Sequence, residues 1–203
     1  MTILRQHDVA LEGQTPRGVS VWLRPMTEGD WDILFKWNND PKVLYYSEGD
    51  DVTGYTLEDV QDLYRGVSSN AFCFVIEADG KPIGECWLQR MNLERILADS
   101  EHPHKYPDLD CRRVDLMIGE KQVWGQGIGT EVIRLLTEFG FAKEGADRIF
   151  GCDVVDYNIR SRKAFQRVGY EIISRIEHEP GGKAEYGYDL VLTKEMFLET
   201  RRP

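Results

Sequence analysis

The sequence predicts a mixed α/β (α+β) fold in a single domain. Two apolar runs, 72–77 and 83–88, flank Asp79-Gly80, a dipeptide that favours a tight hairpin between antiparallel strands. Further along, 113–155 has the pattern of a strand, an amphipathic helix and a second strand. The 203 residues, of which 41% are hydrophobic, are enough to fill one such core.

The domain is expected to begin near residue 18. Residues 1–17 are polar and have no sustained period, so we expect them to form an arm ahead of a domain that spans 18–203. The run 19–25 alternates apolar and polar side chains, as a strand does, and it ends at a proline.

Two helices are predicted next. Thr27 and Thr56 each stand three residues before an aspartate, the spacing of a capping box, and apolar residues follow both at helical spacing. The segment 43–49 between them predicts an aromatic and acidic loop. Since adjacent side chains of an extended chain point in opposite directions, Tyr45 or Tyr46 is expected to face a cleft.

The rest of the chain predicts one polar loop and a series of strands and helices. A short helix is expected at 92–98. The segment 100–110, with His102 and His104 as solvated side chains, is expected to be a loop that could cover a substrate site. The expected elements that follow are a strand at 113–119, a helix at 128–142, a strand at 148–155, a helix at 158–168 and strands at 171–176 and 186–192, the last two joined by a turn at Gly181-Gly182.

Composition excludes several classes of protein. The net charge of −10, from 35 acidic and 25 basic residues, would repel nucleic acid and favours a cationic partner, although acidity can also serve solubility alone. No apolar stretch approaches the roughly 20 residues of a membrane span, and the N-terminus lacks the layout of a secretion signal. We therefore expect a cytoplasmic protein that does not bind membranes.

The four cysteines predict neither a metal site nor a disulfide framework. They are widely spaced and form no CxxC pair, so we expect reduced thiols; they are Cys73, Cys86, Cys111 and Cys152.

A glycine-rich segment, 125–130, lies between a predicted strand and a predicted helix. Its backbone amides would converge at a helix N-terminus, where the helix dipole favours an anion such as a pyrophosphate. A P-loop would require a lysine before Thr130, and the dinucleotide-binding fingerprint places its last glycine one residue later. Neither motif fits.

Two segments resemble motifs of the GNAT superfamily of N-acetyltransferases. Trp124-Gly125-Gln126-Gly127-Ile128-Gly129 resembles its phosphate loop, Arg/Gln-x-x-Gly-x-Gly/Ala, and 156–170 resembles its Asn-x-x-Ser/Ala-x-x-x-Tyr/Phe-x-x-x-Gly-Phe/Tyr helix. The resemblance implies a mostly antiparallel sheet of about seven strands, splayed at its centre and flanked by about four helices, with acetyl-coenzyme A as cosubstrate and no metal. It assigns coenzyme contacts to Met117, Ile118, Trp124, Gly125, Gln126, Gly127, Ile128, Gly129, Thr130, Asn158, Lys163 and Phe165.

The sequence departs from these motifs at two positions. Trp124 stands where the family usually has Arg or Gln, which leaves the backbone cradle but removes a side-chain contact. Arg160 or Lys163 could reach the coenzyme's phosphates, or both could lie on a solvated helix face. Phe165 stands where many members have a tyrosine that protonates the departing thiolate. Water or another group such as Tyr157 would supply that proton, or the thiolate would leave into solvent without it.

The region from Tyr106 to Leu190 looks like the aminoglycoside 6′-N-acetyltransferases, notably at Arg113-Val114-Asp115-Leu116 and at 124–130. That resemblance implies direct transfer of the acetyl group to a primary amine of a small cation, most specifically the 6′-amine of an aminoglycoside, and thus antibiotic resistance by acetylation. It also implies that Asp115 is the base and that Asp153 lies in the acceptor pocket. An amine must lose its proton before it attacks a thioester, and a carboxylate can accept that proton. The acceptor site is expected to include Tyr45, Tyr46, Glu48, Asp110, Asp115 and Asp153.

Other acceptors remain open at this point. A protein N-terminus, a polyamine or a hydroxylated lysine of siderophore assembly would use the same coenzyme site. A non-catalytic sensor of acyl-coenzyme A would explain the phenylalanine at position 165. The sequence allows a monomer or a homodimer.

Overall fold

The computed structural model describes residues 3–48, 52–91 and 109–199. The predicted helix at 92–98, most of the loop at 100–110 and both of its histidines lie outside these ranges.

Within the described residues, the fold class is confirmed, with eight strands in place of about seven and six α-helices in place of about four. The strands are β1 Leu11–Gln14, β2 Ser20–Pro25, β3 Ala71–Ala78, β4 Lys81–Arg90, β5 Cys111–Ile118, β6 Arg148–Val155, β7 Glu171–Glu177 and β8 Tyr186–Thr193. The α-helices are α1 Trp31–Trp37, α2 Pro41–Ser47, α3 Leu57–Ser68, α5 Ile128–Ala142, α6 Ile159–Val168 and α7 Lys194–Glu199, and two short 3-10 helices cover Glu28–Asp30 and Lys121–Val123.

The strands form one sheet in the order β1-β2-β3-β4-β5-β6-β8-β7. Every neighbouring pair is antiparallel except β5 and β6, as a strand–helix–strand unit requires. The hairpin between β3 and β4 is the one that Asp79-Gly80 predicts. Both residues adopt a left-handed conformation, with φ values of 48° and 75°, which matches the twist of the flanking strands.

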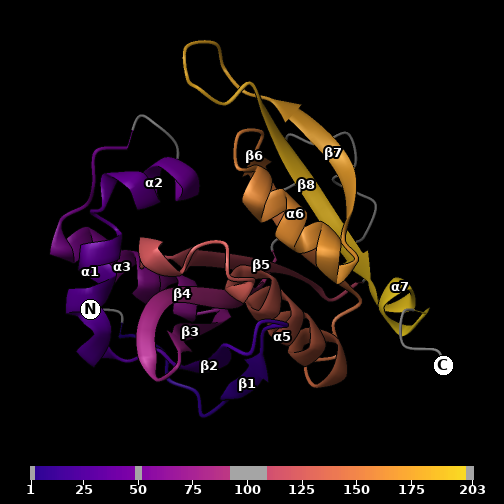
Figure 1. Ribbon diagram of the computed structural model, residues 1–203, viewed down its shortest axis with the longest axis horizontal. Helices are drawn as coiled ribbons and strands as arrows, with labels where there is room; N and C mark the ends of the chain where they lie inside the picture. The colour runs from indigo at the N-terminus through magenta and orange to yellow at the C-terminus, as the bar shows by residue number, and fades with distance from the viewer. Residues whose placement is uncertain (1–2, 49–51, 92–108, 200–203) are drawn as a thin grey trace.

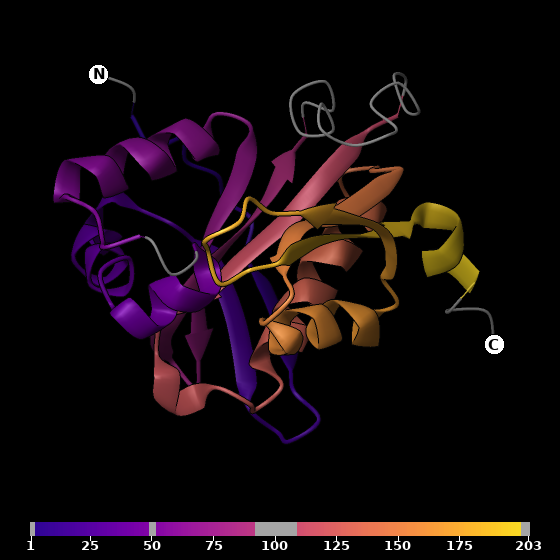
Figure 2. The same ribbon diagram turned by 90° about the horizontal axis from the view of Figure 1, so that it is seen from above.

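Helices cover both faces of the sheet (Figure 2). Alternation along β3 directs Phe74 and Ile76 toward α5, and Cys73 and Val75 toward α1 and α3. The amphipathic helix predicted at 128–142 is confirmed as α5. Four apolar residues of one helix face are buried in the same hydrophobic core as Phe74 and Ile76: Val132, Leu135, Leu136 and Phe139. Each such side chain contributes about 1.5–3 kcal/mol when fully buried.

The segment before residue 18 differs from the expected arm. Residues 11–14 form β1, which pairs with β2, and the backbone N–H of Gln14 donates to the carboxylate of Glu131 on α5 at 3.1 Å. Leu4 is buried against the second core. At four residues, β1 is too short and too polar for alternation to reveal it, and its pairing with β2 is what makes it a strand.

The predicted loop at 43–49 is wrong over most of its length, because Pro41–Ser47 is the helix α2. The Asp40 carboxylate accepts the backbone N–H groups of Lys42 and Val43 at 2.9 and 3.3 Å, and proline at the first helical position has its φ already set. Asp40-Pro41 was the available signal for this helix. Tyr45 and Tyr46 are therefore neighbours on a helix.

The sheet opens between β5 and β6. The two strands pair only from Cys111 opposite Arg148 to Arg113 opposite Phe150, whereas β4 follows β5 as far as Ile118. Figure 1 shows α2 on one side of this opening and α6 on the other. The splayed centre that the sequence resemblance implies is therefore present.

Gly119, directly after β5, is required by close packing. A Cβ atom there would overlap the indole ring of Trp37, which is buried at the end of α1 and donates to Glu120 at 2.9 Å.

We expect Gly119→Ala to lower the free energy of unfolding by about 1–3 kcal/mol in urea titrations, since Trp37 has no room to move. Gly66→Ala is the matched control: a Cβ there meets no atom within 4 Å, and the change should stabilise α3 by about 0.5–1 kcal/mol. Equal stability of Gly119→Ala and wild type would show that this contact is not tight.

Candidate active site

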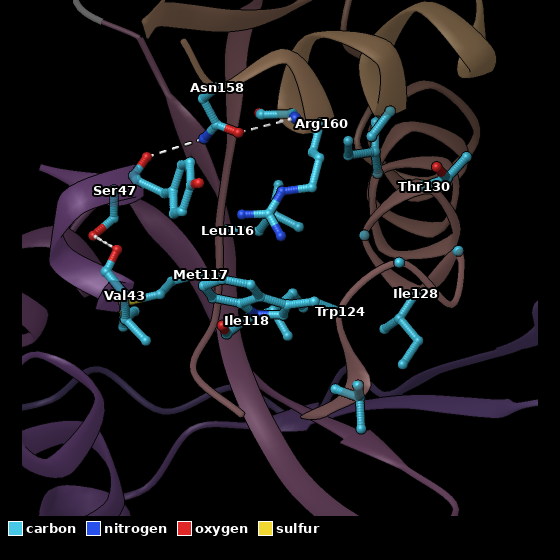
Figure 3. A pocket seen from close by; sticks show the side chains of 18 of the residues that line it. Val43, Ser47, Leu116, Met117, Ile118, Trp124, Ile128, Thr130, Asn158 and Arg160 are labelled. Carbon is cyan, nitrogen blue, oxygen red and sulfur yellow. Dashed lines mark hydrogen bonds between the residues drawn. The ribbon is translucent and has the colours of Figure 1, made fainter. Parts of the chain in front are cut away.

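A cavity of about 220 Å³ lies at the opening of the sheet, between β5, α2 and the N-terminal ends of α5 and α6 (Figure 3). Nine of the twelve residues that the sequence assigns to coenzyme binding line it: Met117, Ile118, Trp124, Gly125, Gly127, Ile128, Gly129, Thr130 and Asn158. Residues that sequence reasoning did not single out, among them Val43, Ser47 and Ser161, complete the wall. Val43 and Ser47 come from α2, which the sequence analysis missed.

The glycine loop holds its backbone in a conformation that other residues rarely adopt. Gly125 and Gly127 have φ values of 78° and 88°, and Gly127 is the N-cap of the 15-residue helix α5. A Cβ on Gly125 would meet no atom within 4 Å, and one on Gly127 would meet only Thr15, at 3.8 Å. The loop backbone is therefore open on the side of the cavity, where unpaired N–H groups and the helix dipole attract an anion.

An arginine from α6 is stacked against the side chain that departs from the family motif. The guanidinium carbon of Arg160 lies 4.3 Å from the centre of the Trp124 ring and 4.4 Å from that of Tyr46, a cation–π arrangement. The Trp124 indole in turn donates to the carbonyl oxygen of Ile118 at 2.8 Å. In Figure 3 the guanidinium of Arg160 faces the Trp124 ring across the cavity. Arg160 thus places a positive charge at the cavity wall, beside the tryptophan that stands where the family usually has Arg or Gln.

Hydrogen bonds join α2 to the start of α6. The Asn158 side chain donates to the carbonyl of Tyr46 at 3.0 Å and accepts the backbone N–H of Ser161 at 3.2 Å, so that it also caps α6 (Figure 3). The Tyr157 hydroxyl donates to the carbonyl of Tyr45 at 2.8 Å. The donor of Asn158 is therefore directed at α2, and a hydrogen bond to pantetheine would have to replace that contact.

Three predicted coenzyme residues are not among those that line the cavity. Phe165 is buried, with its ring beside Gly151, where a Cβ would lie 2.7 Å from the tip of the ring. Lys163 is exposed on α6, and the Gln126 side chain turns back to donate to the carbonyl of Gln122 at 3.4 Å. Position 165 thus belongs to the core of the β6–β8 half of the sheet.

Asp115 lies on β5 just beyond the last pairing with β6. Its carboxylate accepts from the Arg113 guanidinium at 2.5 Å, and 43% of its side chain is exposed. The protein around the carboxyl displaces water and raises the pKa of Asp115, and the charge and hydrogen bond of Arg113 partly oppose this shift. The carboxyl is therefore accessible to solvent and more basic than that of an ordinary aspartate.

Two glutamates gather around Asp115, and one of them was missed by sequence reasoning. Desolvation and then the charge of Asp115 raise the pKa of Glu48, which follows α2 and accepts from the Tyr55 hydroxyl at 3.4 Å. Glu85, on β4, is 3% exposed, and its pKa lies well above the usual range because of burial and then the charges of Asp115 and Glu48. The signal for Glu85 was an acidic residue inside an apolar strand. The negative charges of Asp115 and Glu48 make the site attractive to a cation.

The remaining predicted acceptor residues divide into two groups. Asp153, on β6, is exposed and lies 2.9 Å from His178. Burial, and then the charge of Asp189 ahead of those of Asp115 and Asp153, raises the pKa of the neighbouring Cys152 thiol to about 12. Asp110 instead pairs with Arg112 at 2.9 Å, and Arg112 also binds Glu144. The structure does not bring Asp110 together with Asp115.

The described ranges hold no group of three or more His, Cys, Asp or Glu residues placed to bind a metal ion, and their four cysteines are free thiols. No helix within them is both long enough and apolar enough to span a bilayer.

Comparisons of sequence and of structure both match this chain to acetyltransferases. Residues 20–171 match the family model of the acetyltransferase (GNAT) domain. The aminoglycoside N(6′)-acetyltransferase type 1 of Serratia marcescens is 26% identical over 186 residues, which cover 90% of this chain and 88% of that protein. Crystal structures of aminoglycoside acetyltransferase AAC(6′)-Ib with coenzyme A, and with coenzyme A and kanamycin, are 26% identical, with TM-scores of 0.69 and 0.68. Each match covers 90% of this chain and 100% of the other.

The glycine loop can be tested by adding single methyl groups. We expect Gly127→Ala to weaken binding of coenzyme A by about tenfold or more in calorimetry, because a residue with a Cβ strains the left-handed backbone that lines the cavity. Gly18→Ala is the control, since Gly18 has a similar φ of 83°, equally open surroundings and no contact with the cavity. It should lose similar stability and keep its affinity. Equal affinities of the two variants would contradict the loop geometry.

Proposed function

Because the chain belongs to the GNAT acetyltransferase family, we propose that it transfers the acetyl group of acetyl-coenzyme A directly to a primary amine of a small cation, most specifically the 6′-amine of an aminoglycoside. The observation that carries this proposal is the position of Asp115. It follows the last pairing of β5 with β6, and the next three residues of the strand line the cavity. A base and an anion-binding loop therefore border the same opening.

The loop and Arg160 would hold the diphosphate of the coenzyme. Gly125 and Gly127 leave the backbone clear for close approach, and Arg160 adds a cation at the cavity wall. These features suit a diphosphate, because backbone amides and a guanidinium both donate to phosphate oxygens. Bound in this way, the substrate would extend its thioester along the edge of β5 at Leu116–Ile118.

Asp115 would act on the amine. Its carboxylate attracts the ammonium form, which first loses one proton to water. The neutral amine then forms a bond to the carbonyl carbon, and Asp115 accepts the second proton from the nitrogen. The carbon–sulfur bond then breaks and the thiolate departs. Phe165 carries no hydroxyl and the Tyr157 hydroxyl donates to Tyr45, so water is the proposed source of the proton for sulfur.

The acceptor is tested by a panel of amines. The purified chain, acetyl-coenzyme A and a thiol reagent should release free coenzyme with kanamycin and ribostamycin, and much more slowly with spermidine or with a peptide that has a free N-terminus. Release with the peptide or spermidine alone would overturn the proposed acceptor. Tight coenzyme binding without release for any amine would indicate a sensor.

In the same assay, Asp115→Asn tests the base. We expect turnover to fall by about a hundredfold or more while the affinity for coenzyme A is unchanged, since the amide cannot accept the proton. Asp62→Asn removes the same charge from an exposed position on α3 and should leave turnover as it is. Near-normal turnover of Asp115→Asn would remove this residue from the mechanism.

Arg113 provides a test of pH dependence. Because the base must be ionised, kcat/KM should fall as the pH drops through the pKa of Asp115, and Arg113 holds that pKa down. Arg113→Ala should therefore move the acid limb of the profile to higher pH, whereas Arg113→Lys, which keeps the charge, should move it less. Coincident profiles of Arg113→Ala and wild type would show that Asp115 does not set the acid limb.

A further inference from the structure

The cavity has two ends that differ in chemistry. At one end the glycine loop leads into α5, where backbone N–H groups attract an anion. At the other end α2 closes the cavity with Val43 and Ser47, which Figure 3 shows on the side opposite Ile128 and Thr130. A coenzyme whose diphosphate is held at the α5 end would therefore extend its thioester toward α2.

The α2 end of the cavity is also the end beside Asp115. Met117 lines the cavity and lies two residues after Asp115, so both side chains project from the same face of β5. Glu48 follows directly after α2, and its pKa is raised by burial and then by the charge of Asp115, so this carboxyl lies near Asp115. An acyl group at the α2 end would therefore stand next to the proposed base.

Val43 and Met117 form an apolar wall at this end. They are 2% and 7% exposed, and both belong to the core that fills the space between the sheet and the helices α1 and α3. That core also contains Trp37 and Tyr64, two of the largest fully buried side chains. A close-packed interior resists the insertion of further carbon atoms. The wall therefore has no room to retreat from a longer ligand.

The helix that carries Val43 is held in place. The backbone carbonyls of Tyr45 and Tyr46 accept hydrogen bonds from side chains at the start of α6, at 2.8 and 3.0 Å. A β-branched residue inside a helix has one strongly preferred χ1 rotamer, so the two methyl groups of Val43 are fixed in direction. Met117 has an unbranched side chain that adapts to its surroundings. Val43 is therefore the rigid part of the wall.

We propose that Val43 is a specificity-determining residue that restricts the acyl donor to a chain as short as acetyl. This inference rests on the proposed function, because the position of the thioester follows from a diphosphate at the glycine loop and a base at Asp115. The methyl groups of Val43 stand where the third and fourth carbons of a longer chain would extend. An apolar pocket distinguishes ligands that differ by one methylene by about tenfold or more.

Calorimetry on the whole chain with three ligands tests this role. Coenzyme A, acetyl-coenzyme A and butyryl-coenzyme A differ only in the acyl group. Wild type should bind the butyryl form about tenfold or more weakly than the acetyl form. Val43→Ala should reduce this ratio by about tenfold, because it removes the two methyl groups that a longer chain would meet. Its affinity for coenzyme A, which has no acyl group, should be that of wild type.

Val60→Ala is the matched control. Val60 lies on α3, is fully buried in the same core as Val43 and is not among the residues that line the cavity. The variant should lose similar stability and keep the wild-type ratio of butyryl to acetyl affinity. The same ratio in Val43→Ala and Val60→Ala would show that Val43 does not limit the acyl chain.

A larger side chain at position 43 should have the opposite effect. Val43→Leu keeps an apolar side chain in the core, so it tests the same wall if the alanine variant does not fold. It should weaken the binding of acetyl-coenzyme A by about fivefold or more relative to that of coenzyme A, because the added carbon narrows the space for the acyl group. Equal changes for the two ligands would overturn the proposed pocket.

These measurements need no acceptor, and so separate the inference from the proposed function. Ratios that shift as expected, together with an inactive acceptor panel, would support the role of Val43 and reject the proposed acceptors. Unchanged ratios in a chain that acetylates kanamycin would reject the role of Val43 and leave the proposed function intact. A chain that binds none of the three ligands would overturn both.

Discussion

The short pairing of β5 with β6 is the constraint on which the site depends. Two parallel strands that are joined over only three positions leave the edge of β5 beyond Arg113 open, and a free strand edge attracts any group that can complete its hydrogen bonds. The cavity lies along that edge, Asp115 stands on it, and α5 begins beside it. A single irregularity of the sheet therefore brings together the glycine loop, an open strand edge and the carboxylate of Asp115.

The helix α2 connects the two sides of this opening. Its backbone accepts hydrogen bonds from Tyr157 and Asn158 at the start of α6, and its Tyr46 ring forms one side of the stack around Arg160. The next residue after the helix, Glu48, is coupled electrostatically to Asp115. The same short helix therefore lines the cavity through Tyr46 and leads directly to the carboxyl that lies near Asp115.

The parts of the fold and of the candidate site that depend on a few consecutive residues could be predicted from the sequence. The parts that depend on contacts between distant residues could not. The glycine loop and α5 could be placed because positive φ angles and an amphipathic stripe are properties of a few consecutive residues. The helix α2 also has a local signal, because Asp40 caps it and Pro41 is its first residue. The aromatic and acidic run at 43–49 nevertheless led to the prediction of a loop. His178 and Asp153 are 25 residues apart and meet only because β8 lies between their strands and has glycine at 187. No sequence period encodes such a contact. Glu85 could be read as an anomaly, but its nearness to Asp115 follows from the β4–β5 register.

The two departures from the family motifs have different physical consequences. Tryptophan at 124 removes a polar side chain from the phosphate loop, but its ring supports Arg160, so a cation remains at the cavity. The hydroxyl that is missing at Phe165 is not replaced in the same way. The ring of Phe165 is buried beside Gly151, and a hydroxyl at its tip would need space and a hydrogen-bond partner there. A phosphate contact needs only a positive charge, which a neighbouring helix can deliver. Proton delivery to sulfur needs a donor at one point. A cation thus remains beside the glycine loop at the first departure, whereas the second leaves a buried ring with no hydroxyl.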